Sequence, residues 1–111
     1  MARLNYVELP VSDLAATRSF YEQLFGWSLT AFGPSYAATI SGDTDLGLQG
    51  DPAEATAAPL PVIEVDDLES ALAGVTAAGG TVVRPIFAFP GGRRFHFRDP
   101  SGNEVAAVRS G

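Results

Sequence analysis

Polar side chains that could take part in chemistry alternate with apolar ones near both ends of this chain. Near the start, Tyr6 and Glu8 are two residues apart in an apolar segment, and near the end Arg94 and His96 have the same spacing. A spacing of two places side chains on one face of a β-strand. A face with a carboxylate, or one with a guanidinium and an imidazole, could bind a small polar molecule or move a proton.

The segment that contains the single histidine predicts a strand, a tight turn and a second strand. Residues 94–98 alternate between basic and aromatic side chains, which is typical of a strand with two different faces. The next five residues are Asp-Pro-Ser-Gly-Asn, in which Pro100 sets φ at a corner and Gly102 accepts a positive φ. Residues 104–108 then predict a closing strand.

The rest of the chain predicts two similar halves, each with the element order βαβββ. Asp13 and Gly26 have the residue types that begin and end a helix, and residues 63–68 resemble residues 9–14 at an offset of 54 along the chain. The expected helices run from Asp13 to Gly26 and from Asp67 to Gly80, and the expected strands cover 4–11, 27–32, 36–40, 45–49, 81–87, 93–98 and 103–108.

Motifs at both ends of the chain, in order, are Val11-Ser12-Asp13-Leu14, Ser19-Phe20-Tyr21-Glu22, Leu24-Phe25-Gly26-Trp27 and the strand–Asp99-Pro100-Ser101-Gly102-Asn103–strand ending. Together they resemble the signature of the vicinal oxygen chelate superfamily, which includes glyoxalase I, the bleomycin resistance proteins and the extradiol dioxygenases. The resemblance implies an α+β fold in which two βαβββ modules form a half-open curved sheet, a cup, with the helices outside. We expect one domain over 1–111, with module 1 at about 1–50, a linker at 51–60 and module 2 at about 61–111.

The resemblance also implies four metal-ligand positions in the cup, where metal-dependent members carry His, Glu or Gln. The first falls on Tyr6, the third on Leu60 and the fourth on Ala106. The second lies in strand 46–49, where Gln49 alone could bind a metal. Leu and Ala cannot coordinate a metal ion and a neutral Tyr is a poor ligand. We therefore expect no cofactor; the alternative is a divalent metal in an improvised site made from Glu8, Gln49, His96 and Glu104.

The predicted function is to hold an unidentified small molecule in the cup without a metal, in a resistance or sequestration role like that of metal-free bleomycin resistance proteins. The alternative is a glyoxalase-like lyase or isomerase, or a dioxygenase-type enzyme, with a non-standard site in which Glu8 is the catalytic base. Whether the chain is an enzyme stays open at this point. The predicted ligand-binding residues are Tyr6, Glu8, Tyr36, Gln49, Leu60, Val62, Arg94, His96 and Ala106.

Composition argues against several classes of partner. The net charge of −6 disfavours nucleic acids and anionic membranes, both of which attract basic surfaces. No apolar run approaches the roughly 18 residues of a membrane-spanning helix, and no secretory signal is visible. The chain has no cysteine, so it offers neither a disulfide framework nor a thiolate site. We expect a cytoplasmic protein.

Two further expectations concern packing. Open sheet edges favour association with a second copy, and the resemblance implies a two-fold homodimer. Four aromatic residues in and just after the first predicted helix are expected to be ordinary core residues: Phe20, Tyr21, Phe25 and Trp27.

Overall fold

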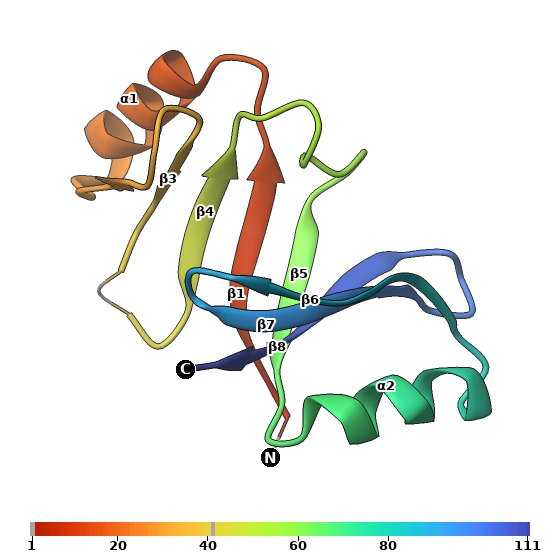
Figure 1. The fold of residues 1–111 in the computed structure, drawn as a ribbon. Helices are drawn as coiled ribbons and strands as arrows, with labels where there is room; N and C mark the ends of the chain where they lie inside the picture. The colour runs from red at the N-terminus through yellow and green to blue at the C-terminus, as the bar shows by residue number, and fades with distance from the viewer. Residues whose placement is uncertain (1, 41) are drawn as a thin grey trace. The chain divides into compact units, whose positions relative to one another are not determined.

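The computed structural model describes residues 2–40 and 42–111 (Figure 1). The chain divides into two compact units. The first is Tyr6–Leu60, and the second joins Pro61–Gly111 with the described residues 2–5 from the start of the chain. Over the described residues each unit contributes one helix and most or all of four strands. The predicted α+β fold of two βαβββ modules is therefore confirmed.

The first unit is an open sheet with a helix on one face. Its strand order is β2-β3-β4-β1, in which β4 runs parallel to β1 and antiparallel to β3. The elements are β1 (Arg3–Pro10), α1 (Leu14–Phe25), β2 (Thr30–Ala31), β3 (Tyr36–Ala38) and β4 (Asp45–Gln49). The helix-side core consists of Leu29, Ala37 and Leu48, packed against Leu9, Val11, Leu14, Tyr21 and Leu46.

Helix α1 begins and ends where the sequence predicted. The Asp13 side chain accepts a hydrogen bond from the Ala16 N–H at 3.0 Å, which satisfies one of the unpaired donors of the first turn. At the other end, Gly26 has φ of 72° and donates its N–H to the Glu22 carbonyl. A left-handed residue at this position stops the helix, and glycine adopts that conformation without a Cβ penalty.

Strand β2 is shorter than the predicted strand 27–32, because the backbone just before it is bonded to α1. The Leu29 N–H donates to the Glu22 carboxylate at 3.0 Å, and the Leu29 carbonyl accepts from the Arg18 guanidinium at 2.6 Å. Both backbone groups of Leu29 are thereby bonded to helix side chains. Only Thr30 and Ala31 pair with β3.

The second unit has the strand order β5-β8-β7-β6. Strand β5 is parallel to β8, whereas β7 is antiparallel to both β8 and β6. The elements are β5 (Leu60–Glu64), α2 (Leu68–Ala77), β6 (Thr81–Phe89), β7 (Gly92–Arg98) and β8 (Glu104–Ser110). Helix α2 lies along one side of β6, β7 and β8 (Figure 1), and the core there is built on Leu68, Phe95 and Ala107.

The cap and turn of the second unit follow the sequence signals. Asp67 accepts from the Ser70 N–H at 3.0 Å, so it caps α2 as Asp13 caps α1. The helix ends at Ala77, ahead of Gly79 with its φ of 98°, rather than at Gly80 as predicted. In the turn between β7 and β8, one oxygen of Asp99 accepts the N–H groups of both Ser101 and Asn103.

Strand β6 is irregular, and its irregularity changes which residues share a face. Its register against β7 shifts on each side of Arg84, which lies opposite His96, while Phe87 lies opposite Arg94. Such a bulge adds a residue to one strand and re-aims the side chains that follow it. As a result the Arg84 guanidinium carbon lies 3.6 Å from the centre of the Phe87 ring.

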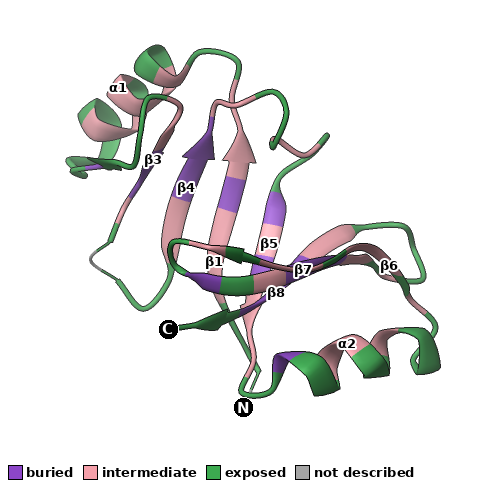
Figure 2. Cartoon of the chain, in the orientation of Figure 1, coloured by how far each residue is buried: buried purple, intermediate pink, exposed green. Residues whose placement is uncertain are grey.

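The expectation that the aromatic residues around α1 form core is wrong for three of the four. Phe20, Phe25 and Trp27 are 58%, 55% and 41% exposed, and no residue of α1 is buried (Figure 2). Only one side of α1, with Leu14 and Tyr21, packs on the sheet. Phe25 packs on Trp27 at 5.0 Å between ring centres, and Trp27 stacks on Tyr21 at 6.1 Å.

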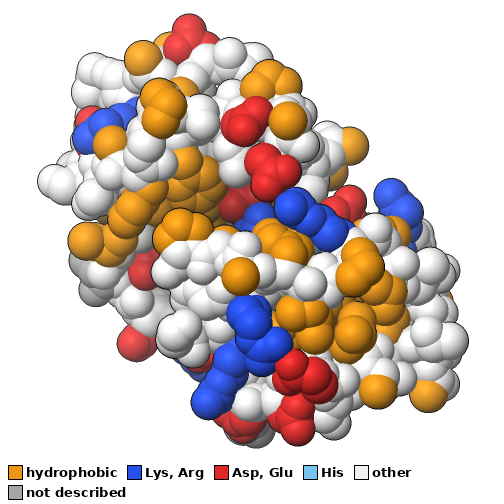
Figure 3. Space-filling view, viewed as in Figure 1, with side chains coloured by type: hydrophobic (Ala, Val, Ile, Leu, Met, Phe, Trp, Pro, Cys, Tyr) orange, Lys and Arg blue, Asp and Glu red, His pale blue; other side chains and the backbone are white. Residues whose placement is uncertain are grey.

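The surface carries charges of both signs. Figure 3 shows basic and acidic groups interspersed with hydrophobic ones on one face. One exposed pair joins Arg93 to Glu69 at 2.6 Å. Neither helix in the described part of the chain has the length and hydropathy needed to span a bilayer.

Candidate functional site

A chain of hydrogen bonds joins three of the predicted site residues on the face of the first sheet that lies opposite α1. Tyr6 and Glu8 come from β1 and Tyr36 comes from β3, so the group depends on the pairing of both strands with β4. The Tyr36 hydroxyl donates to Glu8 Oε1 at 2.9 Å and lies 2.5 Å from the Tyr6 hydroxyl. Glu8 is only 3% exposed. We call these three residues the tyrosine–glutamate cluster.

Gly47 of β4 makes room for the tyrosine–glutamate cluster. It lies between the two other strands, opposite Glu8 on one side and Ala38 on the other. A Cβ atom at this position would overlap with the hydroxyl groups of both Tyr6 and Tyr36. The two phenols can therefore meet above β4 only because this residue has no side chain.

The environment keeps the Tyr36 hydroxyl protonated. Burial raises the pKa of Tyr36 well above its ordinary value of 10, and the negative charge of Glu8 and the neighbouring Tyr6 raise it further. Tyr36 is therefore a hydrogen-bond donor at neutral pH, directed at a carboxylate. A hydroxyl pair beside a buried carboxylate can orient a polar ligand or hold a base in place.

Gln49 shares this face of β4 but is directed elsewhere. It pairs with Tyr36 on β3 and Pro10 on β1. Its side-chain oxygen accepts the Asp51 N–H at 3.0 Å, so the amide secures the start of the following loop.

Leu60 is the last residue of the first unit and is fully buried at 1% exposure. No polar group is contributed by Leu60.

The other predicted site residues lie in the second unit, and the predicted alternation along β7 is confirmed. His96 is opposite Ala106 on β8, and Ala106 is opposite Val62 on β5, so these three side chains form a row on one face. Phe95 belongs to the opposite face, where it packs on Leu68 of α2. Arg94, two residues before His96, lies opposite Val108.

The buried His96 is paired with the partly exposed Glu104. His96 Nδ1 lies 2.7 Å from Glu104 Oε2, and the imidazole is 2% exposed. Burial lowers the pKa of His96, and the positive charges of Arg94 and Arg84 lower it further. The hydrogen bond to Glu104 raises the pKa and so opposes the effect of burial. A neutral imidazole that donates Nδ1–H to the carboxylate has its lone pair on Nε2. Nε2 is buried and has no hydrogen-bond partner among the described residues.

Arg84, Phe87 and Phe89 lie beside His96 and Arg94, and none of the three was predicted from the sequence. The Arg94 guanidinium carbon lies 5.3 Å from the ring centres of both Phe87 and Phe89, while Arg84 stacks on Phe87 alone. The ring centres of Phe87 and His96 are 5.8 Å apart. Strict alternation along β6 would put Arg84 and Phe87 on opposite faces, so only the bulge brings them together.

The metal site that the resemblance implied does not fit these residues. The Tyr6 hydroxyl is bonded to Tyr36, and Leu60 and Ala106 have no side-chain donor atoms. In the improvised alternative, His96 and Glu104 are joined, but Glu8 and Gln49 belong to the other unit. Within residues 2–40 and 42–111, no group of three or more His, Cys, Asp or Glu could hold a metal ion.

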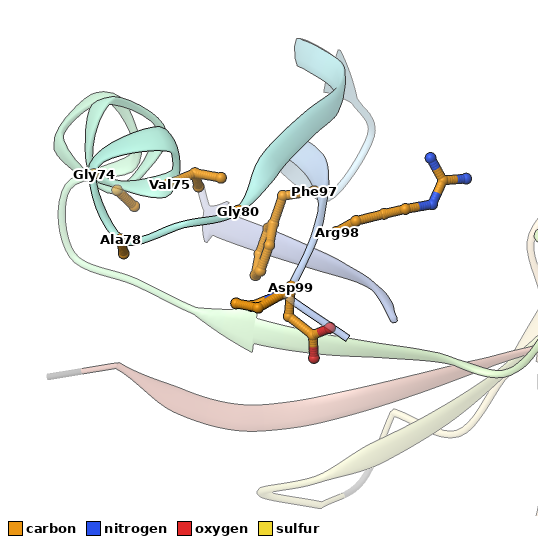
Figure 4. Close-up of a pocket in the computed structure, with 9 residues that line it drawn as sticks. Gly74, Val75, Ala78, Gly80, Phe97, Arg98 and Asp99 are labelled. Atoms are coloured by element: carbon orange, nitrogen blue, oxygen red, sulfur yellow. The ribbon is translucent and has the colours of Figure 1, made fainter. Parts of the chain in front are cut away.

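A pocket of about 280 Å³ lies on the helix side of the second unit and contains none of the predicted site residues (Figure 4). In Figure 4 the Phe97 ring points into the space below α2, whereas the Arg98 side chain extends away from it. The carboxylate of Asp99 is bonded to the adjacent turn. The lining of the pocket is therefore mostly apolar. Its lining is Ala71, Gly74, Val75, Ala78, Gly80, Phe97, Arg98, Asp99 and Pro100.

Solved structures show the same fold at low sequence identity. Methylmalonyl-CoA epimerase from Mycobacterium tuberculosis aligns with a TM-score of 0.78 and 16% identity, over 97% of this chain and 87% of that one. The Mn(II)-bound glyoxalase from Novosphingobium aromaticivorans aligns with a TM-score of 0.72 and 21% identity, over 98% of this chain and 40% of that one.

Sequence comparison identifies the family. The curated protein named "Putative glyoxylase CFP32", from Mycobacterium bovis and Mycobacterium tuberculosis, is 31% identical over 112 residues. The match covers 91% of this chain but 43% of that protein, so the chain spans less than half of these curated relatives. A family model matches residues 3–107. The resemblance drawn from the motifs is confirmed, and the chain belongs to the Glyoxalase/Bleomycin resistance protein/Dioxygenase superfamily.

Proposed function

We propose that this protein binds a small molecule without a resident metal, and that the tyrosine–glutamate cluster of the first unit makes the main polar contacts. The observation that carries the proposal is the Tyr36 hydroxyl, placed between Tyr6 and the buried carboxylate of Glu8. Most buried polar groups in a core serve structure through backbone hydrogen bonds. This cluster instead joins three side chains from two strands, above a glycine that leaves them room.

The cluster favours a ligand with both a hydrogen-bond donor and an acceptor. Glu8 has only acceptor oxygens when ionised, while each phenol can both donate and accept. A ligand hydroxyl or carbonyl oxygen could join this hydrogen-bond chain at either tyrosine. The flanking apolar residue on β3 is the buried Ala38, which would contact the carbon skeleton of such a ligand. Sequestration or resistance is the role that we assign to such binding.

An enzyme is the second candidate, with Glu8 as the base. It is favoured by the hydrogen bond from Tyr36, which would fix the orientation of the carboxylate. A methylmalonyl-CoA epimerase and a glyoxalase share the fold, so enzymes are built on the same scaffold. Without a metal, the Tyr6 and Tyr36 hydroxyls would have to stabilise any negative charge that forms on the substrate.

Ligand screening by thermal shift, on protein purified without chelator or metal-affinity tag, tests the binding proposal. A compound that binds the folded state raises the melting temperature progressively with concentration. We expect the shift to shrink in Tyr36→Phe and to persist in Tyr21→Phe, a matched change outside the cluster. One stoichiometric divalent ion per chain, or ligands that bind Tyr36→Phe as tightly as the natural chain, would overturn the proposal. Glu8→Gln with full turnover of a true substrate would remove the enzyme alternative.

We further propose a homodimer in the cytoplasm. The exposed aromatic surface of α1 supports a second copy as partner, because single-chain proteins rarely leave large apolar groups together on the surface. The absence of cysteine supports a reducing compartment. Light scattering should give twice the mass of one chain, and Leu24→Glu, which changes a side chain that is 58% exposed, should lower that mass. A monomeric mass for the natural chain refutes the dimer.

A further inference from the structure

We propose that the face of the second unit opposite α2 binds a small 2-hydroxycarboxylate, whose carboxylate contacts Arg84 and Arg94 and whose hydroxyl donates to His96 Nε2. This second site is additional to the proposed binding function of the first unit. It uses none of the residues of the tyrosine–glutamate cluster, so each can be tested without the other.

The first step is the unused acceptor on His96. Glu104 takes the proton on the opposite side of the imidazole, at 2.7 Å from Nδ1, and so sets the tautomer in which Nε2 accepts. A buried polar atom without a partner is costly, and native structures contain few of them. Because Nε2 is buried and no described residue bonds to it, a donor from a bound molecule would satisfy it.

The second step is the pair of guanidinium groups beside the imidazole. Arg84 lies directly opposite His96 on the neighbouring strand, and Arg94 lies two residues before it on the same strand. Both are held against aromatic rings, Arg84 on Phe87 at 3.6 Å and Arg94 on Phe87 and Phe89 at 5.3 Å. Stacking restricts the orientation of each guanidinium plane. A guanidinium has five N–H donors, so it can hold a ligand oxygen together with a protein partner.

The third step is the size and charge of the ligand. Residues opposite one another on paired strands are about 5 Å apart at Cβ, so anion and hydroxyl must be close together in the ligand. A carboxylate suits the planar fork of arginine, and a hydroxyl on the adjacent carbon supplies the donor that Nε2 lacks. The charged groups that face His96 are Glu104 from β8, Arg94 from its own strand and Arg84 from β6. Arg84, Arg94 and Glu104 are partly exposed, so the charged end of the site meets solvent.

The chain has one histidine, so the imidazole signals in its NMR spectrum belong to His96. The test is a titration of these signals with glycolate at constant ionic strength. We expect saturable shifts and a neutral form protonated on Nδ1. Acetate, which lacks the hydroxyl, should bind about fivefold more weakly, because one hydrogen bond is lost. Inorganic phosphate tests whether the site binds any small anion, and it should also bind less tightly than glycolate.

Variants locate the site. Arg84→Gln should weaken glycolate binding by about tenfold or more, and Arg94→Lys, which keeps the charge but loses the fork, should also weaken it. Arg93→Gln is the matched control, since Arg93 is the neighbouring arginine on the other face of β7 and pairs with Glu69. It should bind glycolate as the natural chain does.

Several results would overturn the inference. These are an absence of glycolate-dependent shifts at His96, equal affinity for acetate and glycolate, tighter binding of phosphate, or a neutral imidazole protonated on Nε2. Unchanged affinity in both folded arginine variants would also overturn it. None of these results affects the tyrosine–glutamate cluster, whose own test is the Tyr36→Phe variant in ligand screening.

Discussion

The hydrogen bond between Tyr36 and Glu8 gives the most direct test of the tyrosine–glutamate cluster. Tyr36→Phe removes one hydroxyl and leaves the ring that occupies the space above Gly47. Glu8→Gln removes the negative charge and keeps an oxygen that can accept. The two changes together form a double-mutant cycle around a single contact of 2.9 Å.

The expected magnitudes follow from the burial of the pair. A hydrogen bond to a charged group contributes about 1.5–3 kcal/mol, and a neutral one about 1 kcal/mol. Tyr36→Phe loses its bond to Glu8 and its contact with Tyr6, so the free energy of unfolding should fall by about 2–4 kcal/mol. In the Glu8→Gln background only neutral bonds remain to be lost. The coupling energy should therefore be about 1 kcal/mol, in the direction of mutual stabilisation.

Urea unfolding followed by tryptophan fluorescence is the assay. The single tryptophan, Trp27, belongs to the same unit as Tyr36, so its emission reports on that unit. Tyr21→Phe is the control, because Tyr21 packs through its ring on α1 and Trp27. It should change the stability by less than about 0.5 kcal/mol. A coupling energy near zero between Tyr36 and Glu8, with unchanged urea slopes, would show that the contact does not stabilise the protein.

Gly47→Ala should lower the free energy of unfolding by about 1–3 kcal/mol, because the new Cβ overlaps with both phenols. Gly74→Ala is the control, because a Cβ at that position meets nothing within 4 Å. Equal losses of stability in the two variants would contradict the close packing at Gly47. Since the pKa of Tyr36 is raised in the folded protein, the stabilisation that its protonated hydroxyl provides is complete below pH 10 and is lost above it, at up to about 1.4 kcal/mol per pH unit. The free energy of unfolding of Tyr36→Phe should therefore fall less steeply with pH above 10 than that of the natural chain. Equal pH dependence in the two proteins would contradict the raised pKa. Asp13→Ala should lower the free energy of unfolding by about 1 kcal/mol, because it removes the cap of α1, and Asp13→Asn should lower it much less. Urea unfolding measures both changes. Unchanged stability in Asp13→Ala would mean that α1 does not need the cap.

Much of the fold was predictable because local signals coincide with tertiary structure. Asp13 and Asp67 have the residue type that caps a helix, and both accept the expected backbone hydrogen bond. The alternation of Phe95 with His96 fixes two faces of a strand, since one face packs on a helix. Where a backbone group has a competing partner, the prediction was wrong. Leu29 looks like a strand residue, but its N–H and carbonyl are bonded to α1.

The candidate site was only partly predictable, because register between distant strands is not visible in one sequence. Tyr6, Glu8 and Tyr36 were all proposed as contacts, yet nothing in the sequence indicates that Tyr36 bonds to Glu8 rather than to another group. Arg84 was missed because a bulge shifts the phase of β6, and simple alternation assigns it to the wrong face. Exposed aromatics such as Trp27 were placed in the core because apolar spacing does not show how much of a helix the sheet covers.

The bulge in β6 also affects how this protein meets other chains. Strand β6 is the last in the strand order of its unit, and such a strand offers unpaired backbone groups that can template aggregation. Pro85 lies inside the irregular stretch, where it removes one donor from that strand, and the register shifts there disturb the regular ladder. Replacing this segment with a regular strand would therefore do more than misplace Arg84. It would create a continuous edge and make the protein prone to form intermolecular sheets.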